Sequence, residues 1–93
     1  MNFIEFNRYL NNSSSTLSTS ERLVLFVVLT GHPRTPSDIA RILGLRQSSV
    51  STLITSLEDR QLVKRHAAAT DRRSVIILCT KKSIGLRSNI LSQ

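Results

Sequence analysis

Hydrophobic and polar positions follow a helical spacing in two neighbouring stretches of the chain, separated by Gly44. In each stretch the apolar residues lie three or four positions apart, which places them on one face of a helix. They are Ile39, Ile42 and Leu43 in the first stretch and Val50, Leu53, Ile54 and Leu57 in the second. Glycine is common at the left-handed position that ends a helix. The pattern therefore predicts a helix-turn-helix over residues 36–59, with the second and longer helix at residues 47–59.

The start of the first helix has its own local signals. Thr35 supplies a side-chain oxygen for the cap, and Pro36 stands at the first helical position, where its missing N–H costs nothing. Asp38 places a carboxylate in the first turn, where the helix dipole favours negative charge. These residues predict that the helix begins at about Pro36.

A second pattern follows the two helices, over residues 62–79. Two apolar or β-branched runs, 62–65 and 74–79, are separated by a charged segment, which is typical of an antiparallel hairpin. We expect the connecting loop, residues 66–73, to carry Asp71, Arg72 and Arg73 at its tip. The chain is thus predicted to be mainly α with a small β-hairpin, in the order of a winged helix-turn-helix. The cationic tip can enter a minor groove, or it is simply the solvated end of a hairpin.

Short helices are expected on both sides of this unit, within a single domain of residues 1–93. An N-terminal helical arm, residues 1–12, carries an aromatic stripe of Phe3, Phe6 and Tyr9. Ser18 and Glu21 form a capping-box pattern for a helix that runs through Thr30 and lies beneath the other two. Thr80 can cap a last helix over residues 81–91.

The polar face of the second predicted helix has an unusual composition. Charged side chains usually cover a solvated helix face, but this face is short and uncharged, formed by Gln47, Ser48, Ser51, Thr52 and Thr55. A helix that lies in the major groove needs short polar side chains, because its backbone must approach base edges and phosphates. The composition favours DNA recognition over the alternative, which is an ordinary amphipathic helix with an unremarkable surface.

The run from Ser37 through Thr80 resembles the winged helix-turn-helix of the MarR family of bacterial transcription regulators. The resemblance lies in the Gly44-Leu45 turn, in residues 48–51 that open the next helix, in residues 57–63 that lead into the wing, and in the tip at residues 71–73. It implies a DNA-binding dimer in which the helix containing Ser48 lies in the major groove. It also implies that Arg73 reaches the minor groove and that Asp71 holds this arginine in place.

The expected DNA contacts combine the resemblance with the polar helix face. They are Thr35, Arg46, Gln47, Ser48, Ser49, Ser51, Thr52, Lys64, Arg72 and Arg73. The chain departs from the family at Arg46, where a capping serine or threonine is usual, and at Thr52, where a longer basic residue is common. Arg46 is therefore expected to cap weakly and to meet a phosphate. The chain is also shorter than is usual in the family, so we expect no small-molecule effector.

The net charge of +7 supports a polyanionic partner. Residues 1–33 are neutral overall, so the excess lies in residues 34–93. Beyond the second helix, the contributing cations are expected to be Lys64, Arg65, Arg72, Arg73, Lys81 and Lys82. A concentrated excess is the electrostatic footprint of a phosphate-binding surface. Charge alone does not separate DNA from RNA or from an acidic protein, so the alternative function is a winged-helix module that binds a protein or RNA partner. A further alternative is that the positive charge serves only to keep the protein soluble.

Other classes of protein have little support in the sequence. His32 and His66 have no Cys, Asp or Glu at metal-ligand spacing, and no nucleophile elbow or phosphate-binding glycine loop occurs. We therefore expect no enzyme, no cofactor and no metal. The sequence shows neither a membrane-spanning run nor a secretory signal, and the one cysteine, Cys79, cannot form an internal disulfide. A cytoplasmic protein is expected, with Cys79 as a small core residue or, alternatively, a redox switch.

The last expectation concerns assembly. If the three-helix core forms without residues 1–12, the aromatic stripe remains an exposed apolar patch, and such patches usually mark an interface. We expect a homodimer whose termini pack across subunits through Phe3, Phe6, Leu10, Ile84, Ile90 and Leu91. Two-fold symmetry would make the operator an inverted repeat. The alternative is an arm that folds back on its own domain in a monomer.

Overall fold

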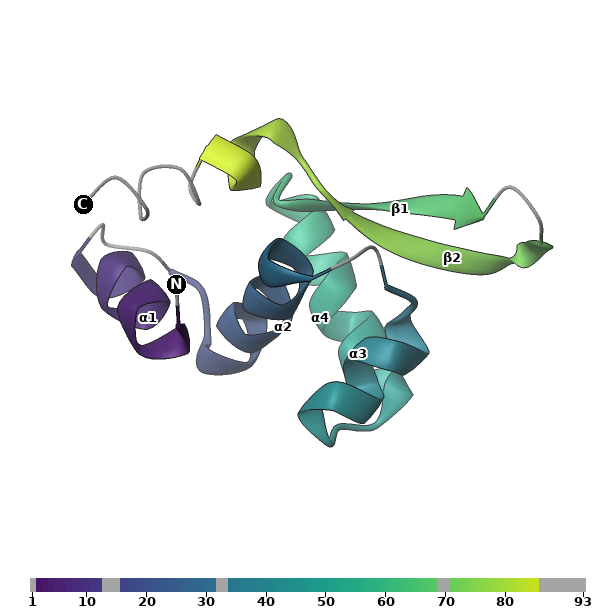
Figure 1. Ribbon diagram of the computed structural model, residues 1–93, viewed down its shortest axis with the longest axis horizontal. Helices are drawn as coiled ribbons and strands as arrows, with labels where there is room; N and C mark the ends of the chain where they lie inside the picture. The colour runs from purple at the N-terminus through teal and green to yellow at the C-terminus, as the bar shows by residue number, and fades with distance from the viewer. Residues whose placement is uncertain (1, 13–15, 32–33, 69–70, 86–93) are drawn as a thin grey trace.

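The protein has a winged helix-turn-helix fold (Figure 1). The computed structural model describes residues 2–12, 16–31, 34–68 and 71–85, with the side chains of 68 and 71–74 left out. In chain order the elements are α1 (Phe3–Asn12), α2 (Thr19–Thr30), α3 (Pro36–Leu43), α4 (Gln47–Asp59), β1 (Val63–Ala68) and β2 (Asp71–Cys79). Residues 81–85 form a further helical turn, and residues 86–91 of the expected last helix lie outside the described part.

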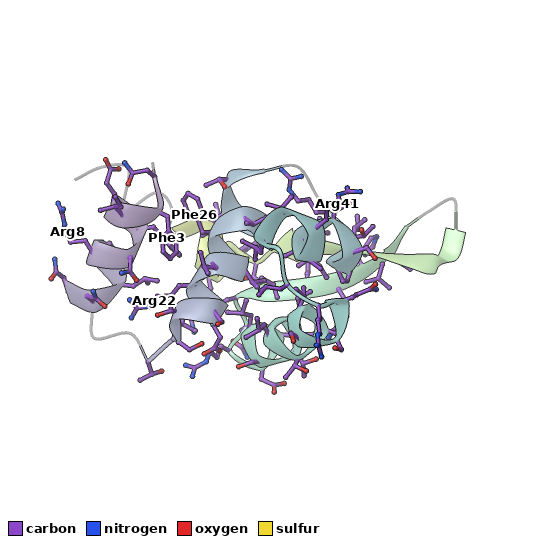
Figure 2. The ribbon with its side chains drawn as sticks, turned by 90° about the horizontal axis from the view of Figure 1, so that it is seen from below. Phe3, Arg8, Arg22, Phe26 and Arg41 are labelled. Carbon is purple, nitrogen blue, oxygen red and sulfur yellow. The ribbon has the colours of Figure 1, made fainter. Side chains whose placement is uncertain are left out.

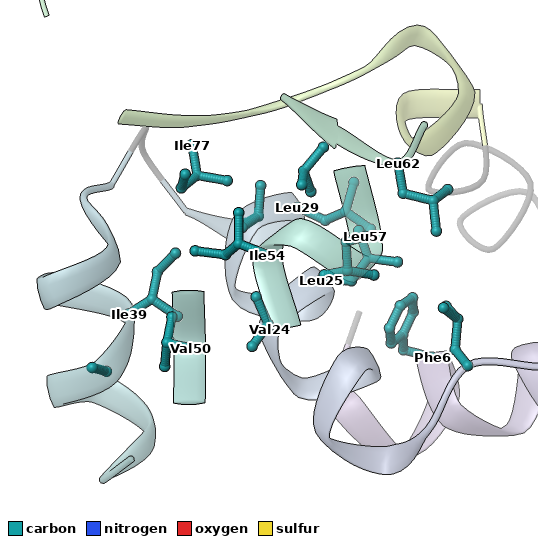
Figure 3. Close-up of a cluster of buried hydrophobic side chains, with 14 of the residues drawn as sticks. Phe6, Val24, Leu25, Leu29, Ile39, Val50, Ile54, Leu57, Leu62 and Ile77 are labelled. Atoms are coloured by element: carbon teal, nitrogen blue, oxygen red, sulfur yellow. The ribbon is translucent and has the colours of Figure 1, made fainter. Parts of the chain in front are cut away.

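The hydrophobic core lies where α2, α3 and α4 meet beneath the base of the hairpin (Figure 3). The fully buried side chains Leu25, Ile39, Ile54, Leu57 and Ile77 come from each of these elements. Burying one aliphatic side chain of this size stabilises the fold by roughly 1.5–3 kcal/mol. The apolar faces predicted for the two helices of the helix-turn-helix are therefore largely the faces that the core uses, although Ile42 is exposed.

The hydrogen bonds predicted at four helix ends are present, at Ser18, Thr35, Gly44 and Thr80. The Asp38 N–H donates to Thr35 Oγ1 at 3.1 Å, and Gly44 takes the left-handed conformation with φ 68°. Ser18 and Glu21 form the reciprocal capping box, with the Ser18 N–H to Glu21 Oε1 distance at 2.9 Å. At the C-terminal turn the Ser83 N–H donates to Thr80 Oγ1 at 3.3 Å. Each end is set by hydrogen bonds within four residues of the cap.

The hairpin is longer than expected. Strand β1 continues to Ala68 and β2 begins at Asp71, so most of the segment predicted as a loop, residues 66–73, belongs to the two strands. The pairing of His66 with Ile76 and of Ala67 with Val75 continues past the apolar run. Backbone hydrogen bonds carry a ladder and do not require apolar side chains, which is why the hydrophobic pattern underestimated its length.

The N-terminal arm packs on its own chain, so the expectation that it stays exposed without a partner is wrong. Phe6 is 0 % exposed and Leu10 is 2 % exposed. The edge of the Phe3 ring meets Phe26 of α2, with ring centroids 5.6 Å apart (Figure 2). Arg22 of α2, which points toward α1 in Figure 2, donates to the side-chain oxygens of Asn7 and Asn11, each at 2.6 Å. The apolar stripe fills a gap against α2 and belongs to the core.

Candidate nucleic-acid interface

The exposed face of α4 carries the polar side chains that the sequence singled out. Gln47, Ser48, Ser49 and Thr52 are exposed, and Ser51 is half-buried. Thr52 Oγ1 donates to the Ser48 carbonyl at 3.1 Å, and Gln47 Oε1 accepts from Ser37 Oγ at 3.0 Å. Among the described residues, no hydrogen bond occupies the hydroxyl group of Ser48 or Ser49. These two hydroxyls are available to an external partner at the start of the helix.

The N-terminus of α4 has no side-chain cap. Arg46 is the N-cap residue, is exposed, and makes no capping hydrogen bond. The first amide groups of a helix lack partners within the helix and carry partial positive charge, which favours an anion. The exposed cation of Arg46 lies beside these amides. The sequence prediction that this cap is weak is confirmed.

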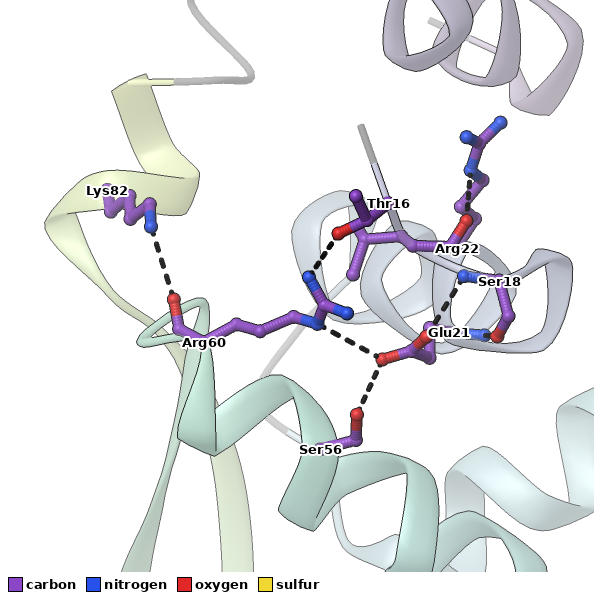
Figure 4. A network of polar contacts seen from close by, with 8 residues as sticks. Thr16, Ser18, Glu21, Arg22, Ser56, Arg60 and Lys82 are labelled. Atoms are coloured by element: carbon purple, nitrogen blue, oxygen red, sulfur yellow. Dashed lines mark hydrogen bonds and ion pairs between the residues drawn. The ribbon is translucent and has the colours of Figure 1, made fainter. Parts of the chain in front are cut away.

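The C-terminal half of α4 is anchored to α2 by a buried carboxylate (Figure 4). Glu21 Oε2 accepts from Ser56 Oγ at 2.6 Å and lies 3.5 Å from the Arg60 Nε. Burial alone would raise the pKa of Glu21, but the hydrogen bonds from Ser56 and Ser18, with the nearby charge of Arg60, hold this pKa below the ordinary value of a glutamate. The carboxylate is therefore ionised at neutral pH, and it joins α2 to α4 through Ser56 and to Arg60 at the end of α4.

The same network continues beyond α4. Arg60 Nη1 donates to Thr16 Oγ1 at 2.6 Å, and Lys82 Nζ donates to the Arg60 carbonyl at 3.3 Å (Figure 4). Thr80 Oγ1 donates to the Gln61 carbonyl at 2.6 Å. The C-terminal end of α4 is thus tied both to the segment before α2 and to the turn after the hairpin.

The predicted cations differ in how far they are free to bind a partner. Arg46 and Lys64 are exposed and form no ion pair with any described residue. Arg65, by contrast, pairs with Glu58 at 2.5 Å, and Arg41 pairs with Asp38 at 2.6 Å. Arg65 is therefore engaged within the protein and is not simply part of a cationic surface. Nothing in the composition distinguished it from Lys64.

Other predicted site residues lie in several places. Thr35 is half-buried and its hydroxyl oxygen serves the cap of α3. The side chains of Asp71, Arg72 and Arg73 lie outside the described residues, although their backbone begins β2. Of the residues expected to form the dimer, Phe6 and Leu10 are buried, Phe3 is half-buried and Ile84 is 52 % exposed. Ile90 and Leu91 lie outside the described residues.

Among the residues that the structure describes, no three His, Cys, Asp or Glu side chains gather as a metal site requires. No described helix combines the length and the apolar character needed to cross a membrane. Cys79 is half-buried, packs against the core, and places its Sγ 3.4 Å from the Val28 carbonyl oxygen.

The fold is similar to those of solved bacterial regulators. A MarR-like transcriptional regulator from Thermotoga maritima is 32% identical, with a TM-score of 0.78 over 96% of this chain and 64% of that one. A second regulator from Thermotoga maritima is 20% identical, with a TM-score of 0.80 over 96% of this chain and 61% of that one. MepR of S. aureus, solved in complex with DNA, is 24% identical, with a TM-score of 0.77 over 96% of this chain and 72% of that one.

The chain thus spans only 64% of the length of the first of these regulators and 61% of the length of the second. No curated protein matches it. The model of the MarR family matches residues 15–74, which include α2, the helix-turn-helix and most of the hairpin. Because this match covers well over half of the sequence and the fold agrees with it, the chain belongs to the MarR family.

Proposed function

We propose that this protein is a sequence-specific, double-stranded DNA-binding transcription regulator. The observation that carries the proposal is the exposed face of α4, which presents short uncharged polar side chains while the rest of the helix is held by the core and by Glu21. Such a face lets a helix backbone approach base edges closely. The DNA complexes of MepR, and of AbfR in its reduced form, support this proposal through the shared fold.

In the proposed docking, α4 lies in the major groove and the wing tip lies in the adjacent minor groove. Arg46 and the first amides of α4 would hold a phosphate, which fixes the position of the helix without reading sequence. Gln47, Ser48 and Thr52 would meet base edges. The arginines at the start of β2 would reach the minor groove, where the pattern of donors and acceptors is degenerate. In this docking, Arg46 and the first amides of α4 would position the protein on the duplex, whereas Gln47, Ser48 and Thr52 would read its sequence.

We also propose that the protein binds as a two-fold dimer. Since Phe6 and Leu10 are buried within one chain, the surface for a partner must use other residues, of which Ile84 is 52 % exposed. The intact chain should sediment as a dimer at micromolar concentration, and Ile84→Asp should shift it toward the monomer. A wild-type chain that sediments as a monomer would refute the dimer and, with it, an inverted-repeat operator.

Substitutions at the wing and at α4 should have different effects on DNA binding. Arg73→Ala should weaken binding to most duplexes by about 1–3 kcal/mol, because it removes a cationic contact from a groove with a degenerate code. Ser48→Ala and Gln47→Ala should instead change the preference among sequences more than the affinity for random DNA. Gel shifts against a selected operator and a random duplex measure both effects. If all three variants bind both duplexes as the wild type does, the docking is wrong.

A further inference from the structure

Arg65 lies on the core side of the hairpin, although its neighbours in β1 lie on the solvent side. Successive side chains of a strand point to opposite faces, and directly paired residues share a face. Arg65 pairs with Ile77, which is 1 % exposed, and is two positions from Val63, also 1 % exposed. Lys64 and His66 are exposed on the other face, and Arg65, at the edge of the core, is also exposed. A charged side chain thus occupies a position at which the pattern of the strand calls for an apolar one.

From this position Arg65 reaches one side of α4. Its Nη1 donates to Glu58 Oε1 at 2.5 Å, and its Nη2 donates to the Ser51 carbonyl at 3.1 Å and to Thr55 Oγ1 at 3.0 Å. Its backbone N–H also donates to Glu58 Oε2 at 3.4 Å. Ser51, Thr55 and Glu58 are spaced at i, i+4 and i+7, so they form one stripe of the helix. One side chain of the wing therefore spans two turns of α4.

The hairpin is held at the same level from its other strand. Ile77, the partner of Arg65 in the register, donates its N–H to the Arg34 carbonyl at 2.8 Å, just before α3 begins. Toward the tip from this level, no hydrogen bond between described residues joins β1 to α4. Among the described residues, the pair Arg65 and Ile77 is therefore the outermost level at which hydrogen bonds tie the wing to the helix-turn-helix, and beyond it Val75 still packs against the core.

We propose that Arg65 and Glu58 form a positioning bridge that sets the distance and angle of the wing relative to α4, and thereby the ability of both to engage DNA at once. The proposal rests on the proposed DNA-binding function. The side chains are 33% and 38% exposed, so the charge attraction itself is screened by water. The four hydrogen bonds that join β1 to α4 therefore contribute more to the position of the wing than the charge attraction does. Arg65 acts through Glu58 and the α4 backbone, whereas a phosphate contact would act on DNA directly.

The sharpest test uses the sign of the effect of removing a carboxylate. Glu58→Ala and Asp59→Ala remove the same charge from neighbouring positions of α4, but Asp59 makes no contact with Arg65. Electrostatics alone predicts that both variants bind DNA more tightly, because a negative charge leaves the neighbourhood of the phosphates. A positioning bridge predicts that Glu58→Ala binds DNA about 3- to 10-fold more weakly than the wild type, the range expected for a partly exposed, hydrogen-bonded pair, whereas Asp59→Ala does not weaken binding. Equal or tighter binding by Glu58→Ala would overturn the proposal.

The salt dependence of binding separates Arg65 from a direct phosphate ligand. Loss of one phosphate contact reduces the log–log slope by about 0.9, so Lys64→Gln, at an exposed position, serves as the comparison. Arg65→Gln should weaken binding with a smaller change of slope, and the double variant Arg65→Gln with Glu58→Ala should be no weaker than Arg65→Gln alone. A slope change as large as that of Lys64→Gln, or additive losses, would assign Arg65 to the phosphates.

Hydrogen exchange of the free protein tests the bridge without DNA. The amide of Arg65 donates to Glu58, so Glu58→Ala should speed its exchange, whereas Asp59→Ala should leave it unchanged. If no variant, including the wild type, binds duplex DNA, the proposed function fails and this measurement still decides whether the bridge holds the strand. An exchange rate that is the same in both variants would show that Glu58 does not hold the wing.

Discussion

Binding of duplex DNA should weaken about 250-fold between 50 and 200 mM salt, the consequence of a log–log slope of roughly −4 for a dimer that makes several phosphate contacts. The net charge of +7 lies entirely in residues 34–93. This net value already counts the carboxylates that pair with Arg41, Arg60 and Arg65, so these three cations are engaged within the fold. The counterion release is therefore expected from Arg46, Lys64 and the arginines of the wing.

The measurement is a titration of random duplex DNA at four or more salt concentrations. A slope near zero would rule out nucleic acid as the partner and would favour the alternative, a module that binds protein. Parallel titrations with duplex RNA of the same sequence separate the two nucleic acids. The A-form major groove is too deep and narrow for a recognition helix, so a DNA regulator should prefer DNA.

Phe6→Ala should destabilise the protein by about 3–5 kcal/mol, the usual cost of removing a buried phenylalanine side chain. The ring is 0 % exposed and lies beside Phe26, with centroids 5.6 Å apart. A small domain is typically stable by only about 5–15 kcal/mol, so this loss is a large fraction of the total. Urea unfolding at a single protein concentration measures it.

Ile4→Ala provides the control on the same helix. Ile4 is 69 % exposed, and exposed substitutions away from special features usually change stability by less than about 0.5 kcal/mol. If Phe6→Ala unfolds at the same urea concentration as Ile4→Ala, α1 is not part of the core. The arm would then be free to serve a partner, as the sequence pattern first suggested.

The left-handed residue after α4 shows where sequence signals end. Gln61 has a φ of 63°, a conformation that glycine adopts far more readily than other residues. The Leu62 N–H closes the turn by donating to the Leu57 carbonyl at 3.0 Å. Thr80 holds the Gln61 carbonyl from 19 positions away. A tertiary contact thus helps to hold a conformation that the local sequence does not favour.

The sequence by itself determined the features whose causes lie within one or two helical turns. The caps at Thr35 and Ser18, the left-handed Gly44 and the uncapped start of α4 all depend on neighbours in the chain, so their residues were sufficient to predict them. The apolar face of α4 was predictable for the same reason. Helical spacing shows that a face is buried, whatever covers it.

Only the tertiary structure decided what covers each face and which charges remain free. The stripe of Phe3 and Phe6 predicted burial, but its partner is α2 of the same chain, a choice that depends on how a distant helix is shaped. In the sequence Arg65 is one of several cations, and only the strand register shows that its side chain pairs with Glu58. Both outcomes depend on contacts between residues far apart in sequence, whose geometry exists only after the helices and the hairpin have packed, so the hydrophobic pattern and the charge count carry no record of them.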